Sequence, residues 1–297
     1  MSLVRLSIMY GKLEGTGFAR DPSGYLSIEA GIFRKHGLEV SWEYVQGTEE
    51  RYRRLANGSA QISLVVGRAS LQHFLASKST RILGCVMNSC PYYLLGAPRI
   101  TNLRDLKGKT VACRQGPSRN MPIAEAFFER ARLRLGEDLT FQLPDSDQNA
   151  FDLLTSGKVS AALLPRPYGF MAEEHGFKRI SEWPDIVDDP LAITIETTAA
   201  LARERGKDFS RFLEAHREGV GYLKTHRAEA IGVLEKQFGH SPSLARKTYD
   251  DYLICMDERL TVDFAKLEAL VSQEAPDVSG GARRIASEWI VPGGLRG

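Results

Sequence analysis

The sequence has few of the features that mark several common protein classes. Its 297 residues include only four cysteines and contain no Cys-x-x-Cys pair: Cys85, Cys90, Cys113 and Cys255. Cysteines this sparse argue against a disulfide scaffold and leave the redox compartment open. No run of 18 apolar residues occurs, so we expect nothing that spans a bilayer. The formal net charge is only +2, which disfavours nucleic acid and charged membrane surfaces as partners.

Motifs for cofactors and catalysis are also missing. The string GKT at 108–110 is not a phosphate loop, because Leu103 stands where that motif requires its first glycine. The six histidines show no metal-ligand spacing, and no GxSxG elbow occurs. We interpret Cys113, next to Arg114, as a small buried hydrophobe rather than a nucleophile. We therefore expect no cofactor, no metal and no catalytic residue.

What is present is typical of a folded globular protein. Hydrophobic residues make up 43% of the chain and charged residues 26%. A chain of this length forms one large domain or two medium ones, and buries roughly 75% of the surface of its unfolded form. No disulfide or metal is needed to hold such a core together.

A similar string occurs twice, once in each half of the chain. Residues 53–66 read RRLANGSAQISLVV and residues 152–165 read DLLTSGKVSAALLP. Aligning Leu55 with Leu154 gives an offset of 154 − 55 = 99 residues. In both strings a helix-like segment runs through a turn with glycine into a strand-like segment. We expect the same helix-to-strand corner in two similar lobes.

Strand-like and helix-like segments alternate through both halves, which predicts a mostly parallel sheet with helices on its faces in each. We expect strands at 4–10, 38–45, 60–67, 109–115, 139–144, 158–167 and 178–181. We expect helices at 25–37, 49–58, 121–136, 148–157 and 168–176, and a nearly all-helical segment after 206.

Two extended apolar stretches, beginning at 85 and at 191, are expected to cross between the lobes. Residues 1–88 and 194–297 would then form lobe 1, with the C-terminal helices, and residues 89–193 would form lobe 2. Such a two-strand hinge permits closure around a ligand.

Four segments resemble the substrate-binding proteins of nitrate, sulfonate and taurine ABC importers, a group that includes thiamine-pyrimidine precursor binders and pyrimidine synthases. They are YLSIEAGIFRKHGLEVSWE, RLANGSAQIS, NLRDLKGKTVACRQGPS and LLTSGKVSAALLPRPYG, and the resemblance covers residues 4–230. It implies a type II periplasmic-binding-protein fold, with two α/β lobes joined by a two-strand hinge and a ligand held between them. The chain departs from the family at Gln61 and Ser160, where aspartate is usual, and at Arg166, where glutamate is common.

In open α/β sheets, ligands bind beyond the carboxyl ends of the strands. Three of the four predicted strand ends in this chain carry an arginine, whose planar guanidinium suits a carboxylate, sulfonate or phosphate. Ser118 is expected to cap a helix whose free amides and dipole attract an anion. The alternative interpretation is that the arginines are surface charges and the aromatic residues belong to the core. The predicted ligand-binding residues are Tyr10, Thr16, Phe18, Gly67, Arg68, Arg114, Gln115, Ser118, Arg166 and Tyr168.

The favoured hypothesis is a binding protein that delivers a small anionic or zwitterionic organic ligand (sulfonate, carboxylate or pyrimidine-like) to an ABC permease, and that acts as a monomer without nucleic acid. One alternative is an enzyme of the same fold, such as a pyrimidine synthase, a desulfinase or a decarboxylase. Segment 48–58 lacks the lysine and histidine of the synthases, and loop 11–24 lacks the cysteine that the resemblance requires of a desulfinase. A cytoplasmic ligand sensor is the third hypothesis.

The first residues, MSLVRLSIMYG, enter a strand pattern at Val4 without a basic region or an apolar export segment. A cytoplasmic protein and a mature start both fit this pattern. We expect a mature start, from which an export signal has been removed, and therefore a periplasmic location.

Overall fold

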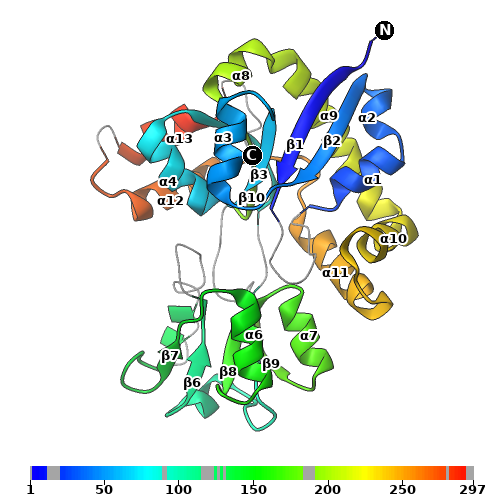
Figure 1. The fold of residues 1–297 in the computed structure, drawn as a ribbon. Coiled ribbons are helices and arrows are strands. Elements are labelled where there is room, and N and C mark those ends of the chain that lie inside the picture. Colours follow the sequence, from blue (N-terminus) through cyan, green and yellow to red (C-terminus); the bar gives the residue numbers. More distant parts are fainter. Residues whose placement is uncertain are drawn as a thin grey trace.

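The computed structural model describes residues 2–11, 21–88, 92–114, 124–125, 128–129, 132–182, 191–278 and 281–291, with Arg68 described in its backbone only. Within these ranges the chain forms two five-stranded sheets, one above the other in Figure 1, each with its own helices. We call the sheet that contains the first strand, with its helices, the first lobe. The other sheet and its helices are the second lobe.

The sheet of the first lobe has the strand order β2-β1-β3-β10-β4. Its strands are β1 (Val4–Tyr10), β2 (Leu38–Tyr44), β3 (Ile62–Val65), β4 (Thr80–Met87) and β10 (Ile193–Thr198). Strand β1 is parallel to β2 and β3, whereas β10 is antiparallel to β3 and β4. The returning chain thus inserts between two strands of the first half of the sequence.

The helices around this sheet come from both ends of the chain. They are α1 (Ser23–Glu29), α2 (Ile32–Lys35), α3 (Thr48–Ala56), α4 (Gly67–Ser77), α8 (Ala199–Glu204), α9 (Gly206–Thr225), α10 (Arg227–Phe238), α11 (Pro242–Cys255), α12 (Phe264–Glu274) and α13 (Gly281–Trp289). The predicted helical character of the chain after 206 is confirmed. Helix α4 and strand β4 were missed by the sequence analysis, and Gly67 is the first residue of α4 rather than the last of a strand.

The sheet of the second lobe has the order β7-β6-β8-β5-β9. Its elements are β5 (Tyr92–Gly96), the short 3-10 helix η1 (Leu103–Leu106), β6 (Thr110–Ala112), β7 (Thr140–Gln142), α6 (Asp147–Thr155), β8 (Ala161–Pro165), α7 (Tyr168–Glu174) and β9 (Lys178–Glu182). Of the predicted helix at 121–136, residues 124, 125, 128 and 129 are helical, and most of the rest lies outside the described residues. The predicted architecture of two α/β lobes is confirmed.

The two repeated corners have the same geometry. Helix α3 is followed by its C-cap Asn57 and then by Gly58, which adopts a positive φ of 74°; helix α6 is followed by its C-cap Ser156 and then by Gly157, with a φ of 72°. In both, the glycine N–H donates to the carbonyl three residues earlier, that of Leu55 or of Leu154. A positive φ here favours glycine, which has no Cβ to clash.

Each corner is followed by the same backbone hydrogen bond to the neighbouring parallel strand. Gln61 N–H donates to the Ser7 carbonyl, and Ser160 N–H donates to the Thr110 carbonyl. The Gln61 side chain also accepts a hydrogen bond from the Ser7 N–H at 2.8 Å. Gln61, which stands where aspartate is usual in the family that the sequence resembles, therefore has a structural role.

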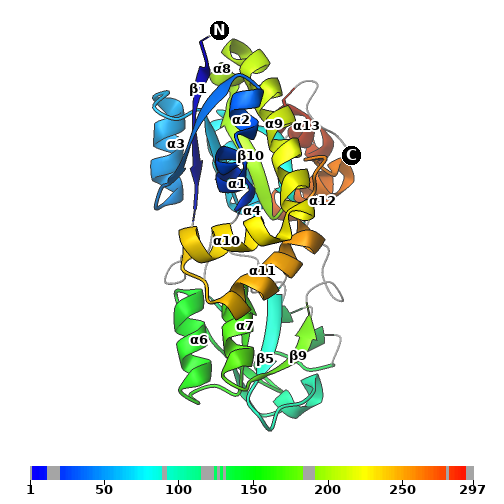
Figure 2. The same ribbon diagram turned by 90° about the vertical axis from the view of Figure 1, so that its right-hand side faces the viewer.

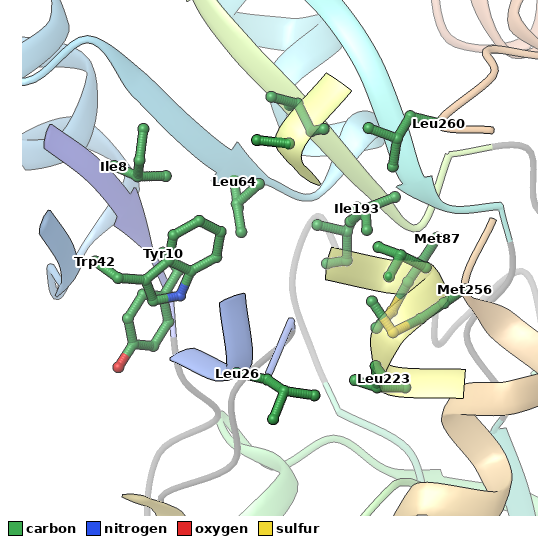
Figure 3. Close-up of a cluster of buried hydrophobic side chains, with 14 of the residues drawn as sticks. Ile8, Tyr10, Leu26, Trp42, Leu64, Met87, Ile193, Leu223, Met256 and Leu260 are labelled. Atoms are coloured by element: carbon green, nitrogen blue, oxygen red, sulfur yellow. The ribbon is translucent and has the colours of Figure 1, made fainter. Parts of the chain in front are cut away.

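The largest core cluster lies between the first sheet and the helices α1, α9, α10 and α11. Figure 3 shows Tyr10 against Trp42 in this cluster, and their ring centroids are 6.3 Å apart. Helix α1 packs closely on Trp42, since a Cβ on Gly24 would lie 2.2 Å from the indole ring. Glycine at 24 thus lets α1 approach the sheet behind the end of β1.

Helix α11 contacts both lobes. Tyr249, Tyr252 and Met256 belong to the core cluster of the first lobe, whereas Leu244 packs in a cluster of the second lobe. Figure 2 shows α11 at the level between the two sheets, next to α7. The carboxyl-terminal part of the chain therefore ties the lobes together, in addition to the two crossings.

Candidate functional site

The parallel strands of both lobes direct their carboxyl ends toward the space between the lobes. In Figure 2, β1 of the upper lobe runs downward and β9 of the lower lobe runs upward. Strand β8 runs in the same direction as β9, because both are antiparallel to β5. The segments after β1, β3, β6 and β8 are thus the ones that can meet a ligand held between the lobes.

Arg51 lies at the carboxyl end of β1 and was missed by the sequence analysis. Its Nη1 donates to the Val45 carbonyl at 3.1 Å and its Nη2 to Thr48 Oγ1 at 3.2 Å. A Cβ on Gly11, the residue after β1, would lie 2.7 Å from Arg51 Nη1. The cation is therefore packed against the start of the glycine-rich loop. The sequence does contain a signal that could have identified Arg51. Residue 51 lies in the first turn of the helix after β2, which places it near the carboxyl edge of the first sheet.

The amino end of α4 lies at the carboxyl end of β3. The residue before the helix, Val66, provides no side-chain cap, and Gly67 N–H donates to the Leu191 carbonyl at 3.1 Å. A Cβ on Gly67 would lie 2.4 Å from Leu191 Cβ, so glycine permits this close contact with the returning chain. The first N–H groups of a helix have no helical acceptor, and with the helix dipole they favour an anion.

Arg114 follows β6 and is partly exposed. Its Nη1 lies 3.1 Å from Asp147 Oδ2 at the start of α6, and the arginine side chain retains 35% exposure whereas the aspartate retains 4%. Asp147 thus orients the guanidinium while part of the side chain stays accessible. Arg114 thus follows a strand end, and its contact with a ligand stays a prediction.

Arg166 follows β8 but its guanidinium is directed to helix α11. The Arg166 side chain is 1% exposed, and its Nε lies 2.5 Å from Asp251 Oδ2. Tyr93 OH donates to the other oxygen of Asp251 at 3.0 Å, and Arg166 Nη2 donates to Cys255 Sγ at 3.1 Å. The guanidinium also lies 5.1 Å from the centre of the Tyr252 ring. Arg166 therefore pairs the second lobe with α11, and a contact with ligand stays a prediction.

Tyr10 and Tyr168 are fully buried. The Tyr10 hydroxyl lies 2.6 Å from the Tyr25 hydroxyl, and burial together with Tyr25 raises the pKa of Tyr10. The Tyr168 ring packs 5.8 Å from the Phe151 ring in the core of the second lobe. Both rings thus contribute to the lobe cores, and their contact with a ligand stays a prediction.

The remaining predicted site residues cannot be placed. Thr16, Phe18, Gln115 and Ser118, and the side chain of Arg68, lie outside the described residues.

A buried carboxyl group lies behind the amino end of α4 and was also missed. Glu196 is fully buried on β10, where it accepts hydrogen bonds from Ser70 Oγ at 2.5 Å and from Thr194 Oγ1 at 2.8 Å. Burial raises its pKa from 4.5 to about 7, against the opposing effect of the two hydroxyls and of Arg51.

A second buried pair follows the glycine-rich loop. Asp21 Oδ2 lies 2.9 Å from His216 Nε2 of α9, and both side chains are fully buried. Asp21 Oδ1 accepts from the N–H and hydroxyl of Ser23 at the start of α1. These contacts fix the end of the loop against the first lobe.

Over the described residues, no group of three or more His, Cys, Asp or Glu side chains is arranged to hold a metal ion. Burial raises the pKa of Cys113 to about 12, which keeps this thiol protonated at neutral pH. A search of the described helices finds none of the length and hydropathy required to cross a membrane.

These lobes, with the parallel strand ends facing each other, define a type II periplasmic-binding-protein fold, as the sequence predicted. The aliphatic sulphonate binding protein SsuA of Escherichia coli is a similar solved structure, with 18% identity, a TM-score of 0.74 and 98% of each chain covered. The alkanesulfonate-binding protein SsuA of Xanthomonas axonopodis pv. citri, bound to MOPS, has 17% identity and a TM-score of 0.69 over 99% of each chain. The resemblance to sulfonate-type binding proteins is thus confirmed in the fold.

An enzyme is similar as well. The desulfurization enzyme DSZB has 13% identity and a TM-score of 0.68, with 97% of each chain covered. No family model matches the chain, and no curated protein matches its sequence.

Proposed function

We propose that this chain is the solute-binding protein of an ABC importer and captures a small organic anion, in the first place a sulfonate, between its two lobes. The observation that carries the proposal is the arrangement of positive groups at facing strand ends. Arg51 and the amino end of α4 lie at the edge of the first sheet, and Arg114 lies at the edge of the second.

A sulfonate matches these groups chemically. It is a permanent anion with three acceptor oxygens, and a guanidinium and helix N–H groups both donate to such oxygens. Two of the similar structures carry sulfonate-binding names, which favours this class over a carboxylate or a pyrimidine-like ligand.

In this proposal Arg114 donates to the anion from the second lobe, while α4 donates backbone N–H groups from the first. Thr16, Phe18, Gln115, Ser118 and Arg68 remain proposed ligand contacts from the segments that follow the strands. Arg51 supplies positive charge beside Gly11 and fixes the start of the loop.

An importer function also implies a permease that receives the ligand from a monomeric binding protein in the periplasm. An enzyme is the second candidate, because DSZB shares the fold. The fate of the bound ligand separates the two: a binding protein releases it unchanged, and a desulfinase hydrolyses the C–S bond of an organic sulfinate to the hydrocarbon and sulfite.

The test is a thermal-shift screen of alkanesulfonates, the matching alkanesulfinates and carboxylates, and pyrimidines, followed by calorimetry and mass spectrometry of the recovered ligand. We expect 1-butanesulfonate or a close analogue to raise the melting temperature and to be recovered intact. Sulfite in the mixture would establish the enzyme instead, and no response to any of the anions would refute the anion site.

A further inference from the structure

The polar groups between the first sheet and the helices α3 and α4 form a buried layer with a carboxyl group at its centre. Glu196, Ser70, Thr194 and Ser63 are each fully buried. Ser70 Oγ and Thr194 Oγ1 both donate to the Glu196 carboxyl, at 2.5 and 2.8 Å. Among the described residues, the cation that acts on this carboxyl group is Arg51, whose effect is smaller than those of burial and of the two hydroxyls. A buried carboxylate without an adjacent cation is costly, so the neutral form is favoured.

The carboxyl group lies close to the edge where the ligand is proposed to bind. On β10, Thr194 is opposite Val65, the last residue of β3, and Glu196 is opposite Ser63, two residues further back. Two residues of strand correspond to about 6–7 Å. Ser70, the hydroxyl donor, lies in the first turn of α4. Glu196 is therefore directly behind the helix end whose N–H groups face the space between the lobes.

The charged and titratable groups that face Glu196 are few. From α3, Arg51 acts on it at longer range and lowers its pKa, whereas Tyr52 stays neutral because burial and the nearby carboxyl both raise the tyrosine pKa. His73 of α4 stacks on Tyr52 at 3.7 Å, and burial lowers its pKa, so it adds no cation near neutral pH. Among the described side chains, β3 and β10 contribute the hydroxyls of Ser63 and Thr194. The protonation of Glu196 thus depends mainly on burial and on charge near the amino end of α4.

We infer that Glu196 is a proton-binding residue coupled to the ligand: an anion that binds at the amino end of α4 drives proton uptake by Glu196, and the site binds anions more tightly when Glu196 is neutral. This inference rests on the proposed function. Its physical basis is the repulsion between two negative charges on either side of one helix turn. By linkage, the factor by which the proton strengthens anion binding equals the factor by which the anion strengthens proton binding.

The expected size of the coupling between anion binding and proton binding follows from Coulomb's law. Glu196 lies about 6–7 Å behind the strand end, and a hydrogen bond places the anion about 3 Å beyond it. The anion would therefore lie about 10 Å from the Glu196 carboxylate. At an effective dielectric constant of about 20, that repulsion corresponds to a change in affinity of about tenfold. Burial already raises the pKa of Glu196 to about 7, and a tenfold coupling would raise it by about one further unit in the complex, so most of the change falls between pH 6 and pH 8.

The experiment is calorimetry with 1-butanesulfonate at pH 6, 7 and 8, in two buffers that differ in ionisation enthalpy. For the wild-type protein we expect the Kd to rise about fivefold from pH 6 to pH 8, because the full tenfold change is reached only above pH 8. We also expect uptake of a fraction of a proton near pH 7, visible as a difference between buffers. The variant Glu196→Gln should bind at every pH with about the wild-type affinity at pH 6, and without proton uptake. Glu229→Gln, an exposed site on α10, is the matched control and should behave as wild type.

The outcomes separate the inference from the proposed function. Equal pH dependence in wild type and Glu196→Gln overturns the inference and leaves the binding function standing. The absence of proton uptake by the wild-type protein overturns it even if the variant does not fold. If 1-butanesulfonate, 1-butyrate and inorganic sulfate all fail to bind the wild-type protein, the anion-binding function fails, and the inference fails with it.

Discussion

Replacing Glu196 by glutamine should change how stability depends on pH even without ligand. The folded pKa of Glu196 is about 7 and its ordinary value is 4.5, so between these values the folded protein binds more protons than the unfolded chain. The free energy of unfolding therefore falls as pH rises through this window and stays low above it. At about 1.36 kcal/mol for each pKa unit, the loss is roughly 3 kcal/mol.

Urea unfolding at pH 5 and pH 8 measures this effect. Glu196→Gln should gain roughly 3 kcal/mol over wild type on going from pH 5 to pH 8, and Glu229→Gln should gain nothing. If the wild-type protein and Glu196→Gln lose the same stability between the two pH values, the claim that Glu196 is buried as a neutral carboxyl group is contradicted.

Arg114→Ala should weaken binding of 1-butanesulfonate by roughly 10- to 100-fold, because a charge-assisted hydrogen bond contributes about 1.5–3 kcal/mol. Its side chain is already 35% exposed, so the stability of the protein should change little. Arg104→Ala, an exposed arginine of the same lobe, should leave the Kd unchanged in the same calorimetry. Equal losses in both variants would point to a general effect of net charge.

Single residues show where sequence reasoning reached the site and where it did not. Arg114 was found because it directly follows a strand. Arg51 was missed because it lies among several charged residues of α3, and the pattern does not tell which of them faces the strand ends. Glu196 was missed because it alternates with two isoleucines in the strand ITIETT, which predicts an exposed face for a residue type that is rarely fully buried. Arg166 was correctly placed at a strand end, but its partner lies 85 residues away on α11, which no local pattern reveals.

The two repeated corners should respond alike to alanine. Gly58 and Gly157 have positive φ values of 74° and 72°. A Cβ would meet no atom within 4 Å at either site, so Gly58→Ala and Gly157→Ala should each cost only the backbone penalty of about 1–2 kcal/mol. Gly232→Ala, in the middle of α10 and equally uncrowded, should instead stabilise the protein by about 0.5–1 kcal/mol. Chemical unfolding would show these opposite signs, and a stabilising alanine at either corner would contradict the shared turn.

Helix α11 should be the element most sensitive to loss of a single charge. Asp251→Asn leaves the Arg166 guanidinium buried without its carboxylate, at a cost of roughly 3–5 kcal/mol. The neighbouring Asp250 pairs with Arg227 at the surface, where both side chains are at least half exposed, so Asp250→Asn should cost about 1 kcal/mol or less. Urea unfolding of the two variants tests the difference, and similar costs would mean that the Arg166 pair contributes little.

At the scale of elements, the sequence predicted most of the repeated strands and helices. It missed α4 and β4, which continue the strand–helix alternation, because no element was assigned between the predicted strand at 60–67 and the crossing that begins at 85. The stretch beginning at 85 was expected as one extended crossing, whereas its two ends belong to strands of different sheets, β4 and β5. An apolar run shows that a segment is buried, but not which sheet it joins.

For the whole molecule, ligand binding should stabilise the fold and bring the lobes together. A ligand at 100 times its Kd adds about 2.7 kcal/mol to the free energy of unfolding. We expect 1-butanesulfonate to raise the melting temperature and to decrease the radius of gyration measured by small-angle X-ray scattering. Stabilisation with an unchanged radius would show that the lobes bind the ligand without closing.

The position of α11 has a consequence for synthesis of the protein on the ribosome. Residues 92–182 leave the ribosome well before residue 251, so the contact between Arg166 and Asp251 forms only after most of the chain has been synthesised. A chain truncated ahead of α11 would lack this buried ion pair between the second lobe and the carboxyl-terminal part of the chain.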